Sequence, residues 1–346
     1  MKPGTADRIY RVAGIATMVG SLRAEGLETK DSLAGVHLSA AKLRSPETRV
    51  SLNQAIQCCR NAIRLSLDPF FAYHTGLLFH ISTFGMYGFA ILSSTDIREA
   101  SRFAQQYQHL AFPTANVTFK EETDYAEWII EPAPVPSVDP PLYKFIVEMH
   151  FGIATCLHRD VLGPSFAPLE LHVTYASADT KSAAEVFGCP VIFSQTQNRL
   201  LLDKHWLDSP ASLGNETTYQ ELLIICDKLM NEMELRAGIA SSIREALLIN
   251  LARPMSFDLV ARQLKMSSRT LKRRLADEGI SYREIVQELR TQVAIKYLRD
   301  TDLNIEDIAS CLGFRDVTNF RRAFRRWTKK TPREFRRSTI SHHLAA

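Results

Sequence analysis

A sequence unit that occurs twice constrains this chain more than any other feature. The segment LVARQLKMSSRTLKRRL (259–275) aligns with DIASCLGFRDVTNFRRAF (307–324), first at an offset of 48 residues and, after a short turn, at an offset of 49. Each copy has an alanine where two helices would touch closely, a turn at Lys265 or Gly313, and a second segment with one apolar and one basic face. Two short helices joined in this way form a helix-turn-helix, so the repeat predicts two such units.

Hydrogen-bonding side chains divide residues 238–338 into helices. Ser, Thr, Asn or Asp at a helix start can accept a hydrogen bond from a first-turn backbone amide that has no partner within the helix. At two predicted helix starts the sequence has a complete capping box, formed by Ser281 with Glu284 and by Thr331 with Glu334. The predicted caps are Ser256, Ser267, Ser281, Asn304, Asp316 and Thr331. They indicate about seven helices, including a long one over 282–299 between the two repeat copies.

The second helix of each copy has a cationic face. With about 100° of rotation per residue, the aromatic residues of the second copy lie opposite its arginines, and leucines lie opposite the cations of the first. The face of the second copy carries Thr318, Arg321, Arg322 and Arg325. Residues 238–338 have a net charge of +10, whereas the rest of the chain carries −6. Most charge runs are merely solvated surface, but the same polarity in both copies favours a surface that binds nucleic acid.

Arginine is well suited to the recognition of double-stranded DNA. Its planar guanidinium can donate two hydrogen bonds to the O6 and N7 atoms of guanine, or to a phosphate. A linking helix over 282–299 would be about 27 Å long, close to the spacing of successive major-groove segments on one face of the duplex. We therefore expect a single chain to contact two adjacent major-groove segments of an asymmetric DNA site.

The remainder of the chain mixes helical and strand patterns. Apolar residues return every three or four positions through 51–67, which indicates a helix. β-branched and aromatic residues over 116–120 and 125–131 indicate an antiparallel pair of strands, and the Pro-rich segment 131–141 cannot continue the second. Further strands are predicted over 169–176, 190–195 and 199–203, and further helices over 142–158, 181–187 and 216–235.

These patterns predict a multidomain fold. An α+β domain is expected over residues 1–235, where helices and short strands are partly segregated. An all-α domain with two helix-turn-helix units joined by a linker helix is expected over 236–338, and a flexible tail over 339–346. Because the larger domain is acidic and the smaller one basic, we expect a sensor joined to a DNA reader rather than a purely architectural DNA-binding protein.

Residues 238–338 resemble the DNA-binding domain of the AraC/XylS family of bacterial transcriptional regulators. The resemblance rests on the two helix-turn-helix units, on GISYREIVQELRTQVAIKYL (279–298), on IEDIASCLGF (305–314) and on TPREFR (331–336). It implies base-reading positions at Arg269, Lys272 and Arg273 in the first unit and at Thr318, Asn319 and Arg322 in the second.

Two positions depart from the family pattern. Lys265 occupies a turn position where glycine is common, and Val317 stands near a base-facing site that is often polar. Because of these departures the DNA sequence that the chain recognises is not predicted, whereas DNA binding itself is still expected.

The amino-terminal part resembles, over 84–107 and 176–208, the sensor domain named after arabinose binding that a subset of these regulators carries. The resemblance implies a domain that binds a small effector or mediates dimerisation. It further implies a transcriptional regulator, expected to be an activator, with RNA polymerase and a second copy of the chain as partners. The uncharged stretch 69–95 offers four polar side chains for an effector, each of which could equally be an ordinary core or surface residue. They are His74, His80, Tyr87 and Ser93.

Other functional classes fit the sequence less well. His150, His158 and Glu148 could form a metal or acid–base cluster on one helix. However, the chain has no HExxH, GxSxG or Gly-rich phosphate motif, so we predict no enzyme activity, no metal and no cofactor. The six cysteines form no CxxC pair and are expected to be reduced.

A membrane location is also disfavoured. Residues 69–95 contain no Asp, Glu, Lys or Arg and are long enough to cross a bilayer. Proline, histidine and glycine residues interrupt this stretch, which favours a buried helix followed by a Gly-rich loop over a transmembrane span. The start MKPGTADR lacks the apolar segment of a secretory signal, so a cytoplasmic protein is expected.

Overall fold

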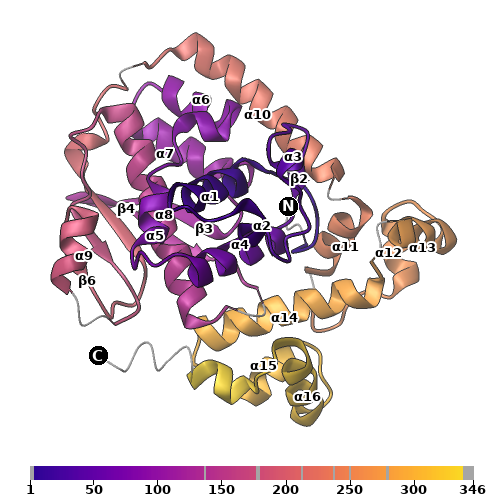
Figure 1. Ribbon diagram of the computed structural model, residues 1–346. Coiled ribbons are helices and arrows are strands. Elements are labelled where there is room, and N and C mark those ends of the chain that lie inside the picture. Colours follow the sequence, from indigo (N-terminus) through magenta and orange to yellow (C-terminus); the bar gives the residue numbers. More distant parts are fainter. Residues whose placement is uncertain are drawn as a thin grey trace. The chain divides into compact units, whose positions relative to one another are not determined.

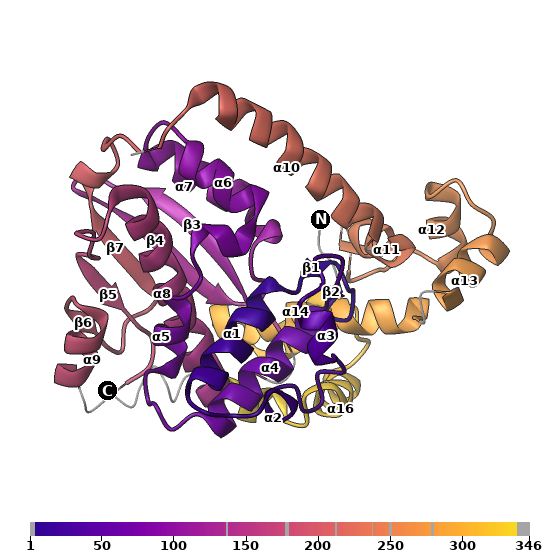
Figure 2. The ribbon, with the colours of Figure 1, turned by 45° about the horizontal axis from the view of Figure 1, so that its top comes forward.

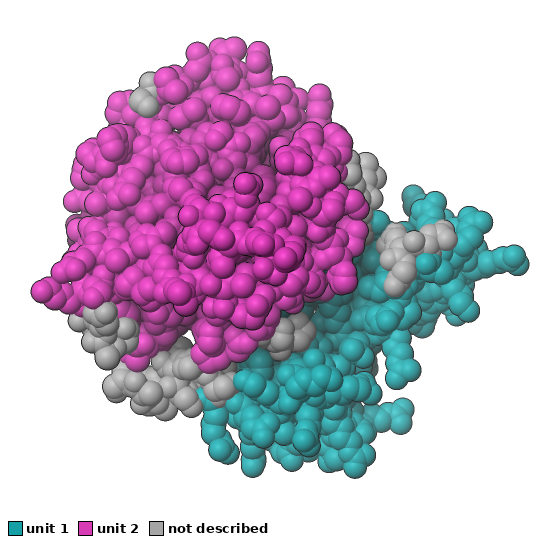
Figure 3. Space-filling model, viewed as in Figure 1, with its two compact units in different colours: residues 1–7, 134–138, 234–344 teal, residues 8–133, 139–233, 345–346 magenta. Residues whose placement is uncertain are grey.

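The computed structural model describes residues 4–135, 138–176, 180–211, 213–236, 238–248, 251–277 and 280–337. The chain divides into two compact units (Figure 3). The amino-terminal unit comprises residues 8–133 and 139–233, and the carboxy-terminal unit comprises residues 234–344 together with residues 1–7 and 134–138. The predicted tail over 339–346 lies outside the described residues.

Helices make up most of the amino-terminal unit, and side-chain caps start several of them (Figure 1). Ser51 and Gln54 form a capping box, in which each side chain accepts a hydrogen bond from the other residue's backbone amide. Asp139 caps another helix, and prolines occupy its first turn, where no intrahelical amide is needed. The helices are α1 (Ala13–Ala24), α2 (Thr29–Ser32), α3 (Ala40–Leu43), α4 (Leu52–Leu65), α5 (Phe71–Gly76), α6 (Met86–Ser93), α7 (Ile97–Gln106), α8 (Pro140–Leu162), α9 (Thr180–Phe187) and α10 (Glu216–Arg236).

Within the described residues, the main sheet of this unit has five strands in the order β3-β4-β7-β5-β6. β5 and β6 are parallel, whereas the other neighbours are antiparallel. The long helix α8 lies against β4 and β3 (Figure 2). A second, two-stranded sheet pairs β1 with β2. The strands are β1 (Tyr10–Arg11), β2 (Arg49–Val50), β3 (Ala115–Glu121), β4 (Tyr125–Pro132), β5 (Glu170–His172), β6 (Val191–Ile192) and β7 (Arg199–Asp203).

The predicted fold class is confirmed in both parts of the chain. The antiparallel pair expected from its β-branched and aromatic residues is β3 and β4, with Phe119 opposite Trp128. β5 and β6 are shorter than predicted, because the backbone beyond them is irregular and Ser194 has a left-handed φ of 59°. Single hydrogen bonds such as the one from the Ser194 amide to the Tyr175 carbonyl continue the contact between these two segments.

The uncharged stretch over 69–95 forms three short helical segments rather than one helix and a loop. They are α5, a 3₁₀ turn over Ile81–Phe84, and α6. Gly76 of α5 faces Gly152 of α8, and a Cβ on Gly76 would lie 2.2 Å from the Met149 carbonyl oxygen. Part of the stretch, including Tyr73, Phe79 and Phe84, is buried in this unit, whereas Leu78, Met86 and Phe89 are exposed. Among the described helices none is long and apolar enough to cross a membrane.

The regular secondary structure in the described part of the carboxy-terminal unit is helical, and all six predicted caps are confirmed. The backbone amide three residues on donates to each cap, as from Leu259 to Ser256 and from Thr270 to Ser267. The helices are α11 (Gly238–Leu248), α12 (Phe257–Gln263), α13 (Ser268–Asp277), α14 (Tyr282–Asp300), α15 (Ile305–Cys311) and α16 (Val317–Thr328), and residues 332–337 are also helical. The remaining caps, Ser281, Asn304, Asp316 and Thr331, start α14, α15, α16 and the helix over 332–337.

The two predicted helix-turn-helix units are α12–α13 and α15–α16. Their first helices start 48 residues apart and their second helices 49 residues apart, as the repeat predicts. Both turns have the same hydrogen bonds, because the amides of Met266 and Phe314 donate to the carbonyls of Ala261 and Ala309 at 2.9 and 3.0 Å. Lys265 and Gly313 occupy the left-handed position of these turns, with φ of 54° and 73°.

Candidate functional site

The second helix of each repeat unit is anchored by its apolar face. Leu271 and Leu275 of α13 are buried, and so are Phe320 and Phe324 of α16. Phe320 packs against Phe314 of the preceding turn with ring centroids 5.4 Å apart. Burying these side chains fixes the rotation of each helix, so its opposite face must point outward.

That outward face is cationic in both units. Arg269, Lys272 and Arg273 are exposed on α13, and Arg322 and Arg325 are exposed on α16. Among the described residues, no carboxylate oxygen lies within salt-bridge distance of these five side chains. Their charges are therefore available to an external anion.

Three other residues singled out on α16 have different surroundings. Thr318 is exposed, while Asn319 is exposed but its Nδ2 atom donates to the capping Asp316 at 2.5 Å. Arg321 is half-buried and its Nη2 atom lies 3.1 Å from Glu306 of α15. Asn319 and Arg321 therefore have part of their hydrogen-bonding capacity engaged within the protein.

The linker helix α14 holds both units in one core. Its buried residues Ile285 and Leu298 belong to the same hydrophobic cluster as Leu271 of the first unit and Phe320 of the second. Figure 1 shows α12 and α13 toward one end of α14 and α15 and α16 toward the other. The helix has 19 residues, so it is about 28 Å long. The two cationic helices are thus carried by one continuous packed scaffold.

A buried ion cluster in the carboxy-terminal unit was missed by sequence reasoning. Arg244 of α11 has a side chain only 2% exposed, and its two terminal nitrogens lie 2.8 Å from Asp7 and 3.1 Å from Glu288 of α14. The Thr5 amide also donates to Glu288 at 2.8 Å. Desolvation raises the pKa of Asp7, partly offset by the Arg244 charge. A separation of 237 residues between Asp7 and Arg244 leaves no periodic signal in the sequence.

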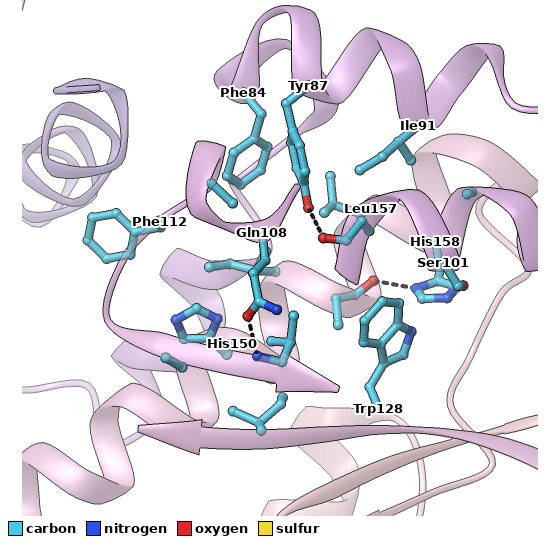
Figure 4. A pocket seen from close by; sticks show the side chains of 18 of the residues that line it. Phe84, Tyr87, Ile91, Ser101, Gln108, Phe112, Trp128, His150, Leu157 and His158 are labelled. Carbon is cyan, nitrogen blue, oxygen red and sulfur yellow. Dashed lines mark hydrogen bonds between the residues drawn. The ribbon is translucent and has the colours of Figure 1, made fainter. Parts of the chain in front are cut away.

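The amino-terminal unit contains a cavity of about 90 Å³ (Figure 4). Its wall comes from the 3₁₀ turn over Ile81–Phe84, from α6, α7 and α8, and from β3, β4 and the segment before β3. Aliphatic and aromatic side chains form most of this wall. The polar or amphipathic residues in it are Tyr87, Ser101, Gln108, Trp128, His150 and His158.

Of the four effector contacts expected from the sequence, Tyr87 lines this cavity. The others lie elsewhere: His74 pairs with Asp68 at 2.5 Å, and His80 pairs with Asp160 at 2.9 Å. Ser93 is buried, and its carbonyl accepts a hydrogen bond from the Asn215 amide. Residues 84–117 supply much of the wall, and the signal in that segment is its content of aromatic and small residues without a regular spacing.

The histidines of α8 do not gather with Glu148. His150 pairs with Thr114 at 3.0 Å, whereas Glu148 accepts a hydrogen bond from Tyr175 at 2.9 Å. Burial lowers the pKa of His150 to about 4 and raises that of Glu148 to about 6. The acid–base cluster considered from the sequence therefore does not form.

Among the described residues, one group could present three ligand atoms to a metal ion, namely His80, Cys156 and Asp160. His80 Nδ1 lies 3.3 Å from Cys156 Sγ and 2.9 Å from an Asp160 oxygen. Burial raises the pKa of the Cys156 thiol to about 12, so the thiol is protonated at neutral pH. His80 and Cys156 are 76 positions apart in the sequence, which hides this group from a search of sequence spacings. All six cysteines lie in described segments and are free.

Comparisons with known proteins cover both units. Residues 26–211 match the family model described as the arabinose-binding domain of AraC transcription regulators, and residues 260–338 match a helix-turn-helix domain model. The chain is 30% identical to the ornithine utilization regulator of Pseudomonas aeruginosa over 299 residues, which cover 85% of this chain and 86% of that protein. It is 29% identical to the regulator VqsM of the same organism over 267 residues, which cover 76% and 82%. The crystal structure of the regulator CdpR, also from P. aeruginosa, aligns over 92% of this chain and 97% of that one, with 25% identity and a TM-score of 0.48.

Proposed function

The chain belongs to the AraC family of DNA-binding transcriptional regulators, and from this premise we propose that it activates transcription in response to a small effector. The effector binds the amino-terminal unit, and the two cationic helices of the carboxy-terminal unit bind adjacent major-groove segments of one operator. The observation that carries this proposal is a pair of exposed cationic faces on a shared core, on which Arg269, Lys272, Arg273, Arg322 and Arg325 have no carboxylate within salt-bridge distance among the described residues. Such a protein acts in the cytoplasm, where it meets DNA and RNA polymerase.

The proposed base contacts come from Arg269, Lys272 and Arg273 on α13. On α16 they come from Thr318, Asn319 and Arg322, with Arg321 and Arg325 toward the phosphates. Arginine side chains on the outer face of a helix can reach guanine edges when the helix enters a major groove. The amides at the starts of α13 and α16 are suited to phosphates, which fix the register of a helix on the duplex.

Effector control is supported by the acidic amino-terminal unit and its cavity. A ligand shifts an equilibrium only if it binds two states with different affinity. We propose that the effector changes either the geometry of a homodimer or the freedom of the DNA-binding unit, and so changes contact with the operator and with RNA polymerase.

Replacing a reading arginine should weaken operator binding. Arg322→Ala is expected to cost about 1–3 kcal/mol of binding free energy. If Arg322 reads a guanine, the preference at one base pair is relaxed. If it contacts a phosphate, binding to all sequences weakens about equally and the dependence on salt becomes shallower. Titrations of matched and mismatched operators at several salt concentrations distinguish these contacts.

Arg273→Ala tests the first unit in the same way, and Lys296→Ala, an exposed cation on α14, is the matched control. The control should bind the operator nearly as the parent protein does. Full operator affinity in the Arg273→Ala, Arg322→Ala double variant would refute the assignment of the reading helices.

Transcription from the native promoter should depend on both the protein and its effector. Deleting the gene should lower expression of a promoter fusion, because an activator is expected to raise transcription. Withdrawing the effector from cells that contain the protein should produce a similar loss. Equal expression with and without a verified effector would identify a constitutive factor instead, and increased expression after deletion would identify a repressor.

A further inference from the structure

We propose that the cavity of the amino-terminal unit takes an uncharged, mostly apolar molecule with one hydrogen-bond acceptor, and that this class of molecule is the effector. The ligand class rests on the cavity wall alone, because the wall decides which chemical groups can be buried there. The role of this ligand as the effector rests on the effector control proposed above.

The wall excludes charged ligands. Among the described residues, no Asp, Glu, Lys or Arg lines the cavity. A carboxylate or ammonium group placed there would lose its hydration without gaining a counter-ion, which costs several kcal/mol per charge. Burial also lowers the pKa of His150 to about 4 and lowers that of His158, so neither histidine supplies a positive charge at neutral pH.

Tyr87 and Gln108 of the wall already have hydrogen-bond partners within the protein. The Tyr87 hydroxyl donates to the Ala104 carbonyl at 3.3 Å (Figure 4). Gln108 accepts from the Val117 amide through Oε1 and donates to the Gln105 carbonyl through Nε2. A sugar needs a partner for each of the several hydroxyls that it buries, and these two side chains already use part of their hydrogen-bonding capacity within the protein. The wall therefore favours a ligand other than arabinose, the sugar after which the matching domain family is named.

Two neighbouring rings of the wall, Trp128 and His158, each offer a polar atom to a ligand. Trp128 is 6% exposed, and its Nε1 atom is buried without a hydrogen-bond partner in the described residues. His158 Nδ1 lies 2.8 Å from the Ala154 carbonyl, which only an N–H group can approach, so Nε2 of the neutral ring is an acceptor. The two rings meet edge to face with centroids 6.5 Å apart, and Figure 4 shows them side by side. A ligand oxygen near Trp128 would satisfy the indole N–H.

The volume sets the size of the ligand. A cavity of about 90 Å³ is smaller than the roughly 150 Å³ of an apolar engineered cavity that binds benzene. A molecule with one ring or a short branched chain is therefore the appropriate size, with slight movement of the wall. p-Cresol is a suitable probe, because its phenol is neutral at pH 7 and supplies the oxygen, whereas toluene has the same ring and methyl group without it.

The experiment uses the full-length protein at pH 7 and measures thermal shift and calorimetric binding of p-cresol, toluene, L-arabinose and L-ornithine. We expect p-cresol and toluene at millimolar concentration to raise the melting temperature, because a ligand of the folded state stabilises it. Arabinose and ornithine should have no effect. Ala154→Phe fills the cavity and should abolish both aromatic signals, whereas Ala24→Phe, at an exposed position of α1, should leave them unchanged.

Trp128→Phe keeps an aromatic ring and removes the N–H donor. It therefore tests whether the indole N–H binds the ligand oxygen, even if Ala154→Phe fails to fold. It should weaken p-cresol binding about fivefold and leave toluene binding nearly unchanged. Equal loss for both probes would overturn the assigned role of Trp128. Binding of arabinose or ornithine that Ala154→Phe abolishes would overturn the ligand class, and so would the absence of any aromatic signal in the parent protein.

Operator binding separates this inference from the proposed function. p-Cresol bound in the cavity should change the affinity of the protein for its operator. If p-cresol binds with the expected response to Trp128→Phe but operator affinity and promoter output stay constant, the ligand class stands and effector control through this cavity fails. If arabinose or ornithine changes operator affinity instead, effector control stands and the ligand class fails.

Discussion

The Gly313→Ala variant is expected to destabilise the second helix-turn-helix unit. Gly313 has a φ of 73°, a conformation that costs a residue with a Cβ about 1–2 kcal/mol. An added Cβ would also lie 1.9 Å from the Ala252 carbonyl oxygen, which is backbone and cannot rotate away. Relieving that overlap by moving the turn adds about 1–3 kcal/mol. We therefore expect a loss of about 2–5 kcal/mol in the free energy of unfolding.

Calorimetry and circular dichroism measure this loss as a lower melting temperature of the carboxy-terminal unit, by about 10 °C or more. The matched control is Lys265→Gly, at the same turn position of the first unit, where φ is 54°. Glycine relieves the left-handed strain there, so this variant should equal or exceed the parent in stability, by up to about 1 kcal/mol. Melting of Gly313→Ala at the parent temperature would contradict the close approach to Ala252.

Replacing Arg244 should destabilise the carboxy-terminal unit by a similar amount. Arg244→Met leaves the carboxylates of Asp7 and Glu288 close together, without the guanidinium that lies between them. Removing one partner of a buried ion pair typically costs about 3–5 kcal/mol, because the remaining charge is uncompensated. Urea unfolding measures this cost. A loss below about 1 kcal/mol would show that the cluster is solvated in solution.

A compensated variant separates the charge effect from the packing effect. The triple variant Arg244→Met, Asp7→Asn, Glu288→Gln removes the stranded charges and should regain most of the lost stability. Arg299→Met, which breaks a pair with the adjacent Asp300 on a more exposed side chain, is the control for loss of an arginine and should cost little. Failure of the triple variant to recover would assign the loss to packing of the Arg244 side chain.

The same cluster predicts a pH dependence. Burial raises the pKa of Asp7 in the folded protein above its value in the unfolded chain. The contribution of Asp7 to stability is therefore fully present below the unfolded pKa and is lost as the pH rises through the folded pKa. Without Arg244 the folded pKa should rise further, so Arg244→Met should recover part of its deficit as the pH falls from 7 to 4.

Local sequence signals predicted the carboxy-terminal unit closely. Each predicted cap, from Ser256 to Thr331, accepts the expected backbone hydrogen bond, because a cap depends only on residues three positions apart. The change of offset from 48 to 49 corresponds to one extra residue in the second turn. The buried faces of α13 and α16 follow from helical periodicity in the same way.

The amino-terminal unit was less predictable because its contacts are distant in the sequence. Apolar composition over 69–95 indicated burial but not the crossing of α5 and α8 at Gly76 and Gly152. His80 is polar and was expected to contact an effector, but its side chain pairs with Asp160, 80 residues away in the sequence. Side-chain direction in such segments depends on which element packs against them, and that is a property of the whole domain.

By itself, the sequence determined the two helix-turn-helix units, their caps and the outward direction of their cationic faces, because each depends on residues within one or two helical turns. Only the tertiary structure decided three other features. It brought Asp7 and Glu288 to Arg244, it formed the cavity between α6, α7, α8 and two strands, and it left the indole N–H of Trp128, a residue of the cavity wall, without a hydrogen-bond partner among the described residues. Burial and pairing across hundreds of residues arise from packing, which no local pattern encodes.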